Sequence, residues 1–291
     1  MAIKVEMLRC FCAVAKAGNL AHAADRLGRT PSAISMTLKQ LEAHLGGPLF
    51  ESERKNRLTA LGEQVFQLGE NQLKHFDGTV EAIERLASAP QGVLRIAAVP
   101  SVAALAFPLI IRYTSRHFPG LKVELRDADT VQVVEALAQG WADIGLASTQ
   151  QSLNGVASSL LFSDAFGLVL SDGHALGRGV APVPVGEVFA MPFLRNALCD
   201  QIQSPAIQAH LSQVDVSVYN IQSLLAMIRE GDWATLLPRT VLRRGSGGLV
   251  FRAVEGLSET RQVYLYARET PSAPEAVAGV EGVIRSMNWS D

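Results

Sequence analysis

The sequence has few residues of the kinds that form disulfides or bind metals. Its three cysteines, Cys10, Cys12 and Cys199, show no CxxC spacing and no cysteine–histidine spacing of a zinc site. Their odd number does not suit a disulfide framework, and the six histidines include no pair at the helical spacing of metal ligands. We therefore expect a reduced protein with no metal site and no cofactor, in which Cys10 and Cys12 are apolar filler.

Long apolar runs are absent too. The most apolar run, residues 96–111, is 16 residues long and contains Pro100 and Pro108, whereas a membrane-spanning helix needs about 20 apolar residues. The first residues, Met-Ala-Ile-Lys-Val-Glu, lack the apolar core of a signal peptide. These features predict a cytoplasmic protein with no membrane partner.

Motifs of common catalytic centres are also missing. The sequence has no Gly-x-Ser-x-Gly elbow, no phosphate-binding loop and no paired carboxylates at a plausible site. We therefore expect no catalytic residues and no enzymatic activity. An enzyme remains an alternative hypothesis, and failure to turn over any bound ligand would count against it.

Neither sign of charge dominates the chain as a whole, whose formal net charge is −2. The distribution is uneven, because residues 1–60 carry a net charge of +4 and the remainder carries −6. At 291 residues the chain has room for two or three domains. The asymmetry predicts a small basic module for an anionic partner, joined to an acidic body. Because phosphate attraction is screened within ~8–10 Å, the local charge matters more than the total.

Residues 19–45 predict two helices joined by a tight turn. Asn19 is a suitable N-cap for the first helix, in which apolar residues recur at i, i+3, i+4 and i+7. Gly28 suits the left-handed position that ends a helix. Thr30 and Pro31 suit the N-cap and first turn of the second helix. The segment therefore has the pattern of a helix-turn-helix.

The second of these helices has an apolar and a polar face. The apolar face, predicted to be buried, contains Ile34, Leu38, Leu41 and Leu45. The outward face contains Ser32, Ser35, Met36, Lys39 and Gln40. Small hydroxyls near the N-terminus and a cation further along suit a helix that enters the major groove of DNA. The alternative is an ordinary helical hairpin within a globular core.

A polar loop follows between short extended pieces, over residues 51–58. It carries Arg54, Lys55 and Arg57, three cations in four positions. One interpretation is a solvated loop. Beside a DNA-reading helix, we favour contact with phosphates or with the minor groove.

The spacing of apolar and small residues over this region is more specific than a helix-turn-helix alone. The pattern consists of Ala23-Ala24, Leu27, Ile34-Ser35, Leu38, Leu41-Glu42, Leu45-Gly46, Leu49-Phe50, Leu58-Thr59 and Gly62. It resembles the N-terminal winged helix of LysR-type transcriptional regulators. Length and later motifs are similar to that family over essentially the whole chain. The resemblance implies a DNA-binding protein.

The chain departs from the family pattern at Pro31, Met36 and Ser52. Pro31 and Met36 stand where many members carry Gln and Arg or Gln, and Ser52 stands where an Arg commonly follows Leu-Phe-Glu. Base contacts of other members therefore do not transfer to these three positions. The candidate DNA-binding residues are Arg29, Thr30, Pro31, Ser32, Ser35, Met36, Lys39, Arg54, Lys55 and Arg57.

A long helix is predicted to begin at Thr59 and to end near residues 87–90. Its 29 residues would span roughly 43 Å at 1.5 Å per residue. A nearly heptad apolar seam contains Leu61, Val65, Leu68, Leu73, Phe76, Val80, Ile83 and Ala87. Such a helix is expected to pair with a copy of itself, although packing on the chain's own body is the alternative. A two-fold dimer predicts a near-palindromic DNA site.

Beyond the hinge at residues 89–92, strands and helices alternate, which predicts an α/β fold. The segment from Gly140 to Leu146 resembles the family's Gly-x-x-Asp-hydrophobic-Gly motif. The resemblance implies two α/β lobes joined by a double crossover, similar to type 2 periplasmic binding proteins. In the second lobe we predict helices over 202–211 and 222–230 and a strand over 214–219.

These patterns divide the chain into three predicted domains. Residues 1–58 are the winged helix-turn-helix, and residues 59–89 are a dimerisation linker helix. Residues 90–291 are an effector-binding domain. Its lobe one comprises residues 92–162 and 267–291, and its lobe two comprises residues 163–266.

In an open α/β sheet, ligands bind outside the carboxyl ends of the strands, where helix N-termini favour an anion. Three predicted helix starts, at Ser101, Thr130 and Gln222, suit one cleft, and the loop 196–201 faces them. Ser101 and Thr130 match effector contacts of relatives, although a plain N-cap hydroxyl is the alternative. Arg195 either pairs with an anion or forms a surface salt bridge, and Cys199 either senses oxidants or lines the pocket. The candidate effector-binding residues are Pro100, Ser101, Thr130, Asn196, Leu198, Cys199 and Gln222.

The sequence therefore predicts a transcription regulator that binds double-stranded DNA and responds to a small-molecule effector, with a carboxylate as one candidate. The resemblance implies self-association as a dimer or tetramer, and RNA polymerase as a further partner. The competing hypothesis is a cytoplasmic small-molecule carrier. A truncation lacking residues 1–90 that retained all activity would support the carrier.

Overall fold

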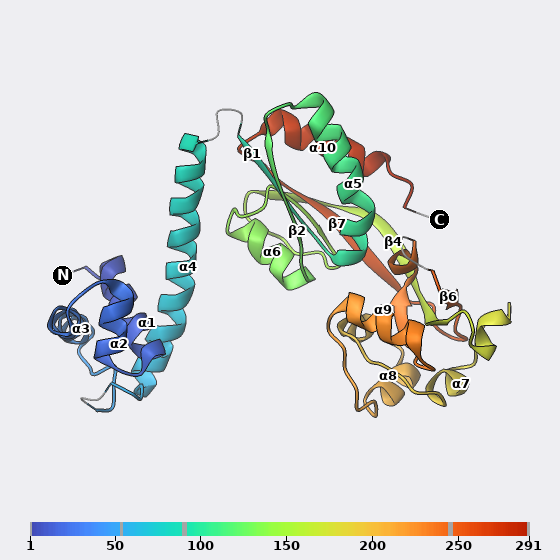
Figure 1. Cartoon of the computed structure of the whole chain (residues 1–291), viewed down its shortest axis with the longest axis horizontal. Coiled ribbons are helices and arrows are strands. Elements are labelled where there is room, and N and C mark those ends of the chain that lie inside the picture. Colours follow the sequence, from blue (N-terminus) through green and yellow to red (C-terminus); the bar gives the residue numbers. More distant parts are fainter. Residues whose placement is uncertain (1, 53–54, 89–91, 244–246, 290–291) are drawn as a thin grey trace. The chain divides into compact units, whose positions relative to one another are not determined.

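The computed structural model describes residues 2–52, 55–88, 92–243 and 247–289. The chain divides into two compact units, Met1–Glu84 and Arg85–Asp291, which are described separately (Figure 1). No helix of the described residues is long and apolar enough to cross a membrane.

The first unit is a small helical domain with its own core. Its helices are α1 (Val5–Ala17), α2 (Leu20–Leu27), α3 (Pro31–Leu45) and α4 (Ala60–Ser88). The core between them includes Phe11, whose ring packs edge-on against Phe50 and Phe66. Phe50 and Leu58 form an antiparallel bridge that closes the predicted wing. The domain therefore has the architecture of a winged helix.

The ends of α2 and α3 confirm the predicted caps. The Asn19 side chain accepts a hydrogen bond from the His22 N–H, and the Thr30 hydroxyl accepts one from the Ala33 N–H. Gly28 has a φ of 62°, in the left-handed region. Pro31 occupies the first turn of α3. These local signals fix the helix-turn-helix because each satisfies a free backbone group or an unusual φ.

The long helix α4 has 29 residues, as predicted. The Thr59 hydroxyl caps it by accepting from the Gly62 N–H at 3.0 Å, and donates to the Pro48 carbonyl. A Cβ at Gly62 would clash with the Leu49 carbonyl, which explains a glycine at this position. The first part of α4 is therefore packed closely against the chain segment that enters the wing.

The second unit is built on a seven-stranded mixed sheet. Its strands are β1 (Val93–Ala98), β2 (Lys122–Asp127), β3 (Ile144–Ala147), β4 (Val156–Ser171), β5 (Thr235–Pro238), β6 (Leu249–Arg252) and β7 (Thr260–Arg268). The order is β2-β1-β3-β7-β4-β5, with β6 paired to β4. β1 is parallel to β2 and β3, whereas β7 is antiparallel to β3 and β4.

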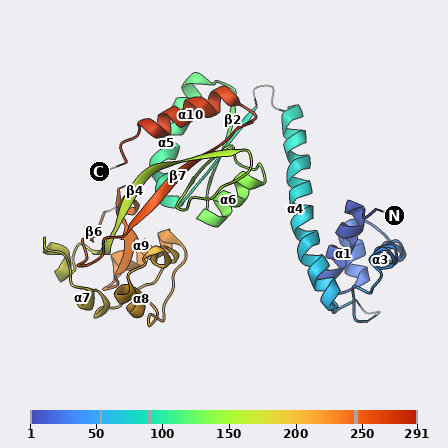
Figure 2. The same ribbon diagram turned by 180° about the vertical axis from the view of Figure 1, so that it is seen from behind.

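Helices cover both faces of this sheet. They are α5 (Pro100–His117), α6 (Thr130–Ala138), α7 (Val185–Phe189), α8 (Pro205–Leu211), α9 (Ile221–Glu230) and α10 (Pro274–Ser286). Short 3-10 turns η1, η2 and η3 span Ala175–Arg178, Ala197–Gln201 and Arg239–Leu242. Figures 1 and 2 show α5 and α10 on one side of the first strands and α6 on the other. Leu94 and Ile96 of β1 share a core with residues of α5 and α10, whereas Ala97 shares one with residues of α6.

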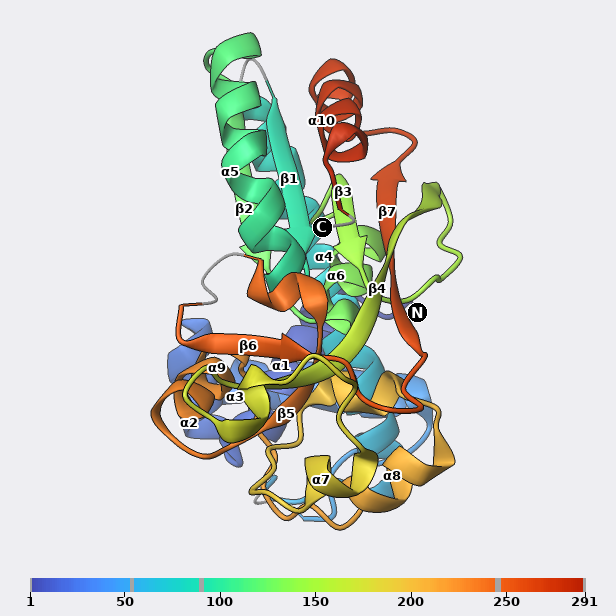
Figure 3. The same cartoon turned by 90° about the vertical axis from the view of Figure 1, so that its right-hand side faces the viewer.

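Two lobes share the long strands β4 and β7 (Figure 3). The first lobe, around β1–β3, α5, α6 and α10, pairs its sheet with residues 156–165 of β4. The second lobe, around β5, β6 and α7–α9, pairs with residues 166–171 of β4. The predicted double crossover is confirmed, because β4 leads into the second lobe and β7 returns from it.

Some elements of the second lobe differ from the prediction. Residues 214–219 do not form a strand, since only Ser217 makes a bridge, to Arg195. Helix α8 begins at Pro205, because the preceding residues 197–201 form the turn η2. The strand β6 was not predicted.

Candidate functional site

The outward face of α3 is open to solvent. Ile34, Leu38 and Leu41 are buried, as predicted. Met36 is 63% exposed, and Ser32 and Lys39 are exposed on the same helix. Pro31 is also exposed and Ser35 is half-buried. This face therefore presents hydroxyls, a thioether and an ammonium outside the core.

Two polar residues before α3 have partners within the domain. Thr30 uses its hydroxyl as the cap of α3, with the Ser32 hydroxyl at 3.1 Å. Arg29 forms a 2.8 Å ion pair with Glu6 of α1. Because both side chains of this pair are well exposed, it contributes little to stability and leaves Arg29 accessible.

The wing places its cations in different environments. Lys55 turns inward, where its ammonium lies 3.4 Å from Glu42 of α3 and over the ring of Phe50. Its φ of 56° is unusual for a residue other than glycine. Arg57 remains 79% exposed beside Glu51, and Arg54 lies outside the described residues. Glu42 also accepts from the Leu49 N–H at 2.9 Å, so it fastens the wing to α3.

Helix α4 presents two different apolar surfaces. Val65, Phe66 and Leu73 pack into the core of the first unit. Asp77 and Glu70 of this part of α4 also form ion pairs with Arg9 and Lys16 of α1. Four large apolar side chains of the described part of α4 are exposed and form a stripe: Leu61, Leu68, Phe76 and Ile83. The predicted seam is therefore divided between the domain's own core and solvent.

In the first lobe, the starts of α5 and α6 follow the carboxyl ends of β1 and β2. Pro100, Ser101 and Thr130 are half-buried there. The Thr130 hydroxyl accepts from the Ser148 N–H at 3.2 Å, and the Ser148 hydroxyl is buried with no partner among the described residues. These residues therefore lie where an α/β sheet binds ligands.

The three helix starts differ in how they are capped. Asp129 caps α6 in a capping box, and Asn220 caps α9 by accepting from two backbone N–H groups. The residue before α5 is Val99, which has no side-chain oxygen. Pro100 has no N–H and the Val102 N–H bonds to the Val99 carbonyl at 3.0 Å, so the first turn of α5 offers the Ser101 N–H to an external acceptor.

The Ser101 hydroxyl contacts a residue that sequence reasoning missed. Arg261 of β7 donates from Nη1 to Ser101 Oγ at 3.0 Å, and from Nη2 to Asp164 at 2.7 Å. Thr240 bonds to both members of the Arg261–Asp164 pair. Burial lowers the pKa of Arg261, and the neighbouring Asp164 carboxylate opposes that shift.

A signal for this pair exists in the sequence. Arg261 is in phase with the buried Val263 and Leu265 of β7, and Asp164 is in phase with the buried Phe162 of β4. A charged residue at an inward-facing position of a strand requires a buried partner of opposite charge. Each charge therefore indicates the need for the other.

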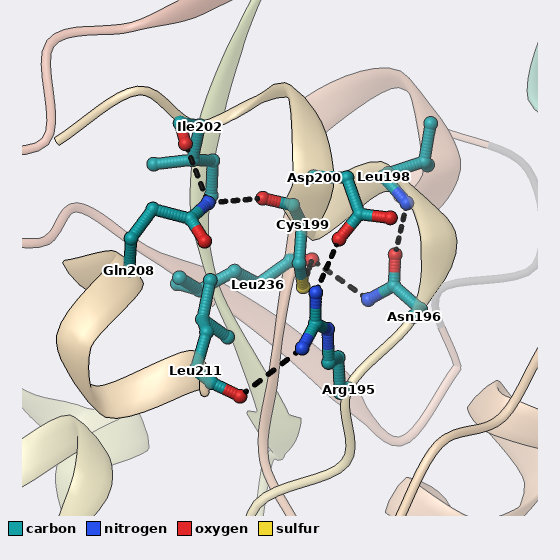
Figure 4. Close-up of polar contacts among 9 residues, drawn as sticks. All are labelled: Arg195, Asn196, Leu198, Cys199, Asp200, Ile202, Gln208, Leu211 and Leu236. Atoms are coloured by element: carbon teal, nitrogen blue, oxygen red, sulfur yellow. Dashed lines mark hydrogen bonds and ion pairs between the residues drawn. The ribbon is translucent and has the colours of Figure 1, made fainter. Parts of the chain in front are cut away.

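Figure 4 shows the loop 196–201, which was predicted to face the cleft. Its polar groups form hydrogen bonds within the second lobe. Asn196 donates to the Thr235 hydroxyl and the Leu236 carbonyl, and accepts from the Leu198 N–H. Leu198 is half-buried between the two cores of the second lobe. The side chain of Asn196 therefore has a structural role in this loop.

Cys199 is fully buried in the second lobe, with its sulfur toward the Leu236 carbonyl. Burial raises its pKa to about 11. A reactive cysteine needs a populated thiolate and access to the oxidant. Neither condition holds here, so the geometry does not support a redox sensor.

Two other residues of this region lie at the surface. Arg195 pairs with Asp200 at 2.6 Å and donates to the Leu211 carbonyl, as the salt-bridge interpretation predicted. The hydrogen bond that Arg195 donates to the Asp200 carboxylate raises the pKa of Arg195. Gln222 is exposed at the start of α9.

Two family models match the chain. The model for the bacterial regulatory helix-turn-helix protein of the lysR family matches residues 5–63. The LysR substrate binding domain matches residues 87–287, well over half of the chain. The chain belongs to the LysR family. It is a LysR-type transcriptional regulator with an effector-binding domain.

Relatives of this LysR-type regulator are similar over most of their length. A probable hydrogen peroxide-inducible genes activator of Streptomyces viridosporus is 27% identical, over 81% of this chain and 78% of the relative. The HTH-type transcriptional regulator YfeR of Shigella flexneri is 26% identical, over 99% and 95%. These relatives are named as regulators of transcription.

Solved structures of the LysR family share the fold. The LysR family regulator CbnR gives a TM-score of 0.64 at 21% identity, over 97% of this chain and 98% of that chain. CbnR complexed with its target DNA gives a TM-score of 0.66 at 21% identity, over 97% and 99%. At this identity the likeness concerns the fold alone.

Proposed function

We propose that this LysR-type regulator reads double-stranded DNA with the outward face of α3. The exposure of Met36, Ser32 and Lys39 beyond a buried apolar face carries the proposal. Side chains of these types hydrogen-bond or contact base edges and phosphates. Thr30, Pro31 and Ser35 complete this surface.

The cations around α3 take different roles in this proposal. Arg29, Arg57 and Arg54 contact phosphates beside the groove, supported for Arg29 and Arg57 by their exposure. Lys55 instead positions the wing through Glu42, because its side chain is only 18% exposed. Its effect on DNA binding is therefore through the shape of the wing.

We further propose that the effector binds at the start of α5, between the two lobes of the second unit. Ser101 accepts from Arg261, and Thr130 accepts from Ser148, so the single proton of each hydroxyl remains for an outside acceptor. The start of α5, which no side chain caps, adds the backbone N–H of Ser101 and a positive dipole. A small carboxylate is the effector class that these donors favour.

The second lobe contributes Leu198 and Gln222 to that site. Leu198 is half-buried and Gln222 is exposed, so both are accessible to an effector. Asn196 and Cys199 support the loop behind them. The proposal has four further parts. The protein dimerises through the exposed stripe of α4, and its domains are residues 1–58, 59–89 and 90–291. It acts in the cytoplasm and contacts RNA polymerase.

Gel-shift titration against the intergenic DNA upstream of the gene tests the DNA-binding proposal. Lys39→Ala should weaken binding about tenfold at moderate salt and reduce the salt slope by about 1, because one phosphate contact is lost. Arg126→Ala, an equal charge change on β2 of the second unit, is the control. Binding without salt dependence or site preference would contradict the proposal.

A thermal-shift screen of small carboxylates and their uncharged amides tests the effector class. Carboxylates should raise the melting temperature more than the amides, and Ser101→Ala should remove the difference. Preference for amides, or an equal response to both, would exclude the carboxylate.

A further inference from the structure

Four polar side chains form a connected cluster where the two lobes of the second unit meet. Arg261 and Asp164 are direct cross-strand partners on β7 and β4, and their side chains are 1% and 3% exposed. Thr240, in the turn η3 after β5, is also buried. Ser101 is at the start of α5. We call these four residues the Arg261 cluster.

The hydrogen bonds of the Arg261 cluster join elements of different lobes. Nη1 of Arg261 donates to Ser101 of the first lobe, and Nη2 donates to Thr240 of the second lobe at 2.6 Å. Asp164 accepts from the backbone N–H of Thr240 at 3.2 Å and from its hydroxyl. One rigid guanidinium therefore holds a residue of each lobe.

A buried ion pair of this kind is a weak source of stability, because removing both charges from water offsets most of their attraction. Its geometry is restrictive, however, since the planar guanidinium directs its donors along fixed lines. A shift of Thr240 relative to β7 must lengthen a bond or rotate the guanidinium. That rotation moves Nη1 away from Ser101.

We propose that Arg261 is a positioning residue that couples the Ser101 effector contact to the second lobe through Thr240. The proposal rests on the effector site proposed above. Arg261 donates to one lone pair of the Ser101 hydroxyl and leaves the hydroxyl proton free for the effector. When a bound effector displaces Ser101, the Arg261 guanidinium moves with it and shifts Thr240 of η3.

Hydrogen–deuterium exchange of the full chain without effector tests the coupling. Thr240→Val keeps the side-chain shape and removes the hydroxyl that bridges Arg261 and Asp164. We expect the amides of residues 101–105, in the other lobe, to exchange about tenfold faster, because their anchor is loosened. Exchange in β1 should stay unchanged and report that the first lobe remains folded.

Thr235→Val is the matched control. Thr235 is equally buried in the second lobe, and its hydroxyl bonds to the Leu194 carbonyl and to Asn196, away from Arg261. This variant should leave residues 101–105 unchanged. Acceleration confined to the second lobe in Thr240→Val, or equal acceleration of residues 101–105 in both variants, would overturn the proposal.

The reverse substitution covers the case in which Thr240→Val unfolds the domain. Ser101→Ala removes one acceptor at a half-buried position and should accelerate exchange of residues 239–242 by about threefold to tenfold. No change there would overturn the proposal. Because no DNA or effector is present, failure of this test is separate from failure of the proposed function.

Discussion

At the scale of single residues, the three cysteines share one environment. Cys10, Cys12 and Cys199 are all buried and free of disulfides. Burial raises the pKa of Cys12 to about 12 and that of Cys199 to about 11. The folded state therefore prefers the neutral thiol, and stability should fall above pH 9, where the thiols of the unfolded chain ionise.

Thiol labelling of the native full chain should consequently be slow. At neutral pH we expect all three cysteines to react with a disulfide reagent at least about 100-fold more slowly than in the denatured chain, because thiolate and access are both lacking. Stopped-flow absorbance measures both rates. One cysteine that reacts as fast as in the denatured chain would contradict the buried assignment.

Met36 gives a second prediction at this scale. Its exposed thioether suits the methyl group of thymine, whereas glutamine pairs with adenine. Met36→Gln should shift the preference at one position of each half-site from thymine toward adenine by about tenfold. Selection from a randomised DNA library measures this shift.

The control for that selection is Val131→Gln, which alters another exposed apolar residue, on α6 of the second unit. It should leave the selected motif unchanged. An identical motif for Met36→Gln and the unaltered chain would remove Met36 from the set of base-contacting residues.

At the scale of elements, the exposed stripe of α4 predicts self-association. Leu68 is 72% exposed at the centre of this stripe. A buried carboxylate without a partner is costly, so Leu68→Glu should weaken the dimer about 100-fold or more without unfolding the domain. Analytical ultracentrifugation over a concentration series measures the dimer dissociation constant.

Gln67→Glu adds the same charge one position away, outside the stripe, and should leave the dimer intact. If Leu68→Glu and Gln67→Glu dimerise alike, the exposed stripe is not the dimer interface.

Elements with strong local signals could be predicted from the sequence. The ends of α2 and α3 agree with the prediction because Asn19, Gly28 and Thr30 mark them. The strand predicted over residues 214–219 does not form, because alternating apolar residues also occur in an extended segment with a single bridge. The sequence pattern could not distinguish these cases, since strand formation depends on a neighbouring strand.

The parts of the candidate site that could be predicted are those that depend on residues close together in the sequence. The cap at Thr30 and the outward face of α3 follow from spacing within one helix. The pairing of Lys55 with Glu42 depends on how the wing folds back onto α3. A count of cations in the wing could not reveal that one of them points inward.

At the scale of the whole molecule, the cores are separate. Among the described residues, the core of the first unit has no member in common with the cores of the two lobes. Calorimetry of the full chain should therefore show more than one unfolding transition. A duplex carrying the selected DNA motif should raise one transition and a bound carboxylate should raise another, each by mass action on its own unit. A single transition that either ligand shifts as a whole would contradict this independence.

The contribution of α4 to the first unit has a consequence for protein engineering. Because Val65 and Leu73 complete the core around α1, a DNA-binding domain truncated after residue 58 would expose apolar core residues to solvent. Grafting a new DNA specificity from another family member must therefore carry the donor sequence past residue 77, which forms an ion pair with Arg9 of α1. Such chimeras should therefore transfer the winged helix and the first part of α4 together.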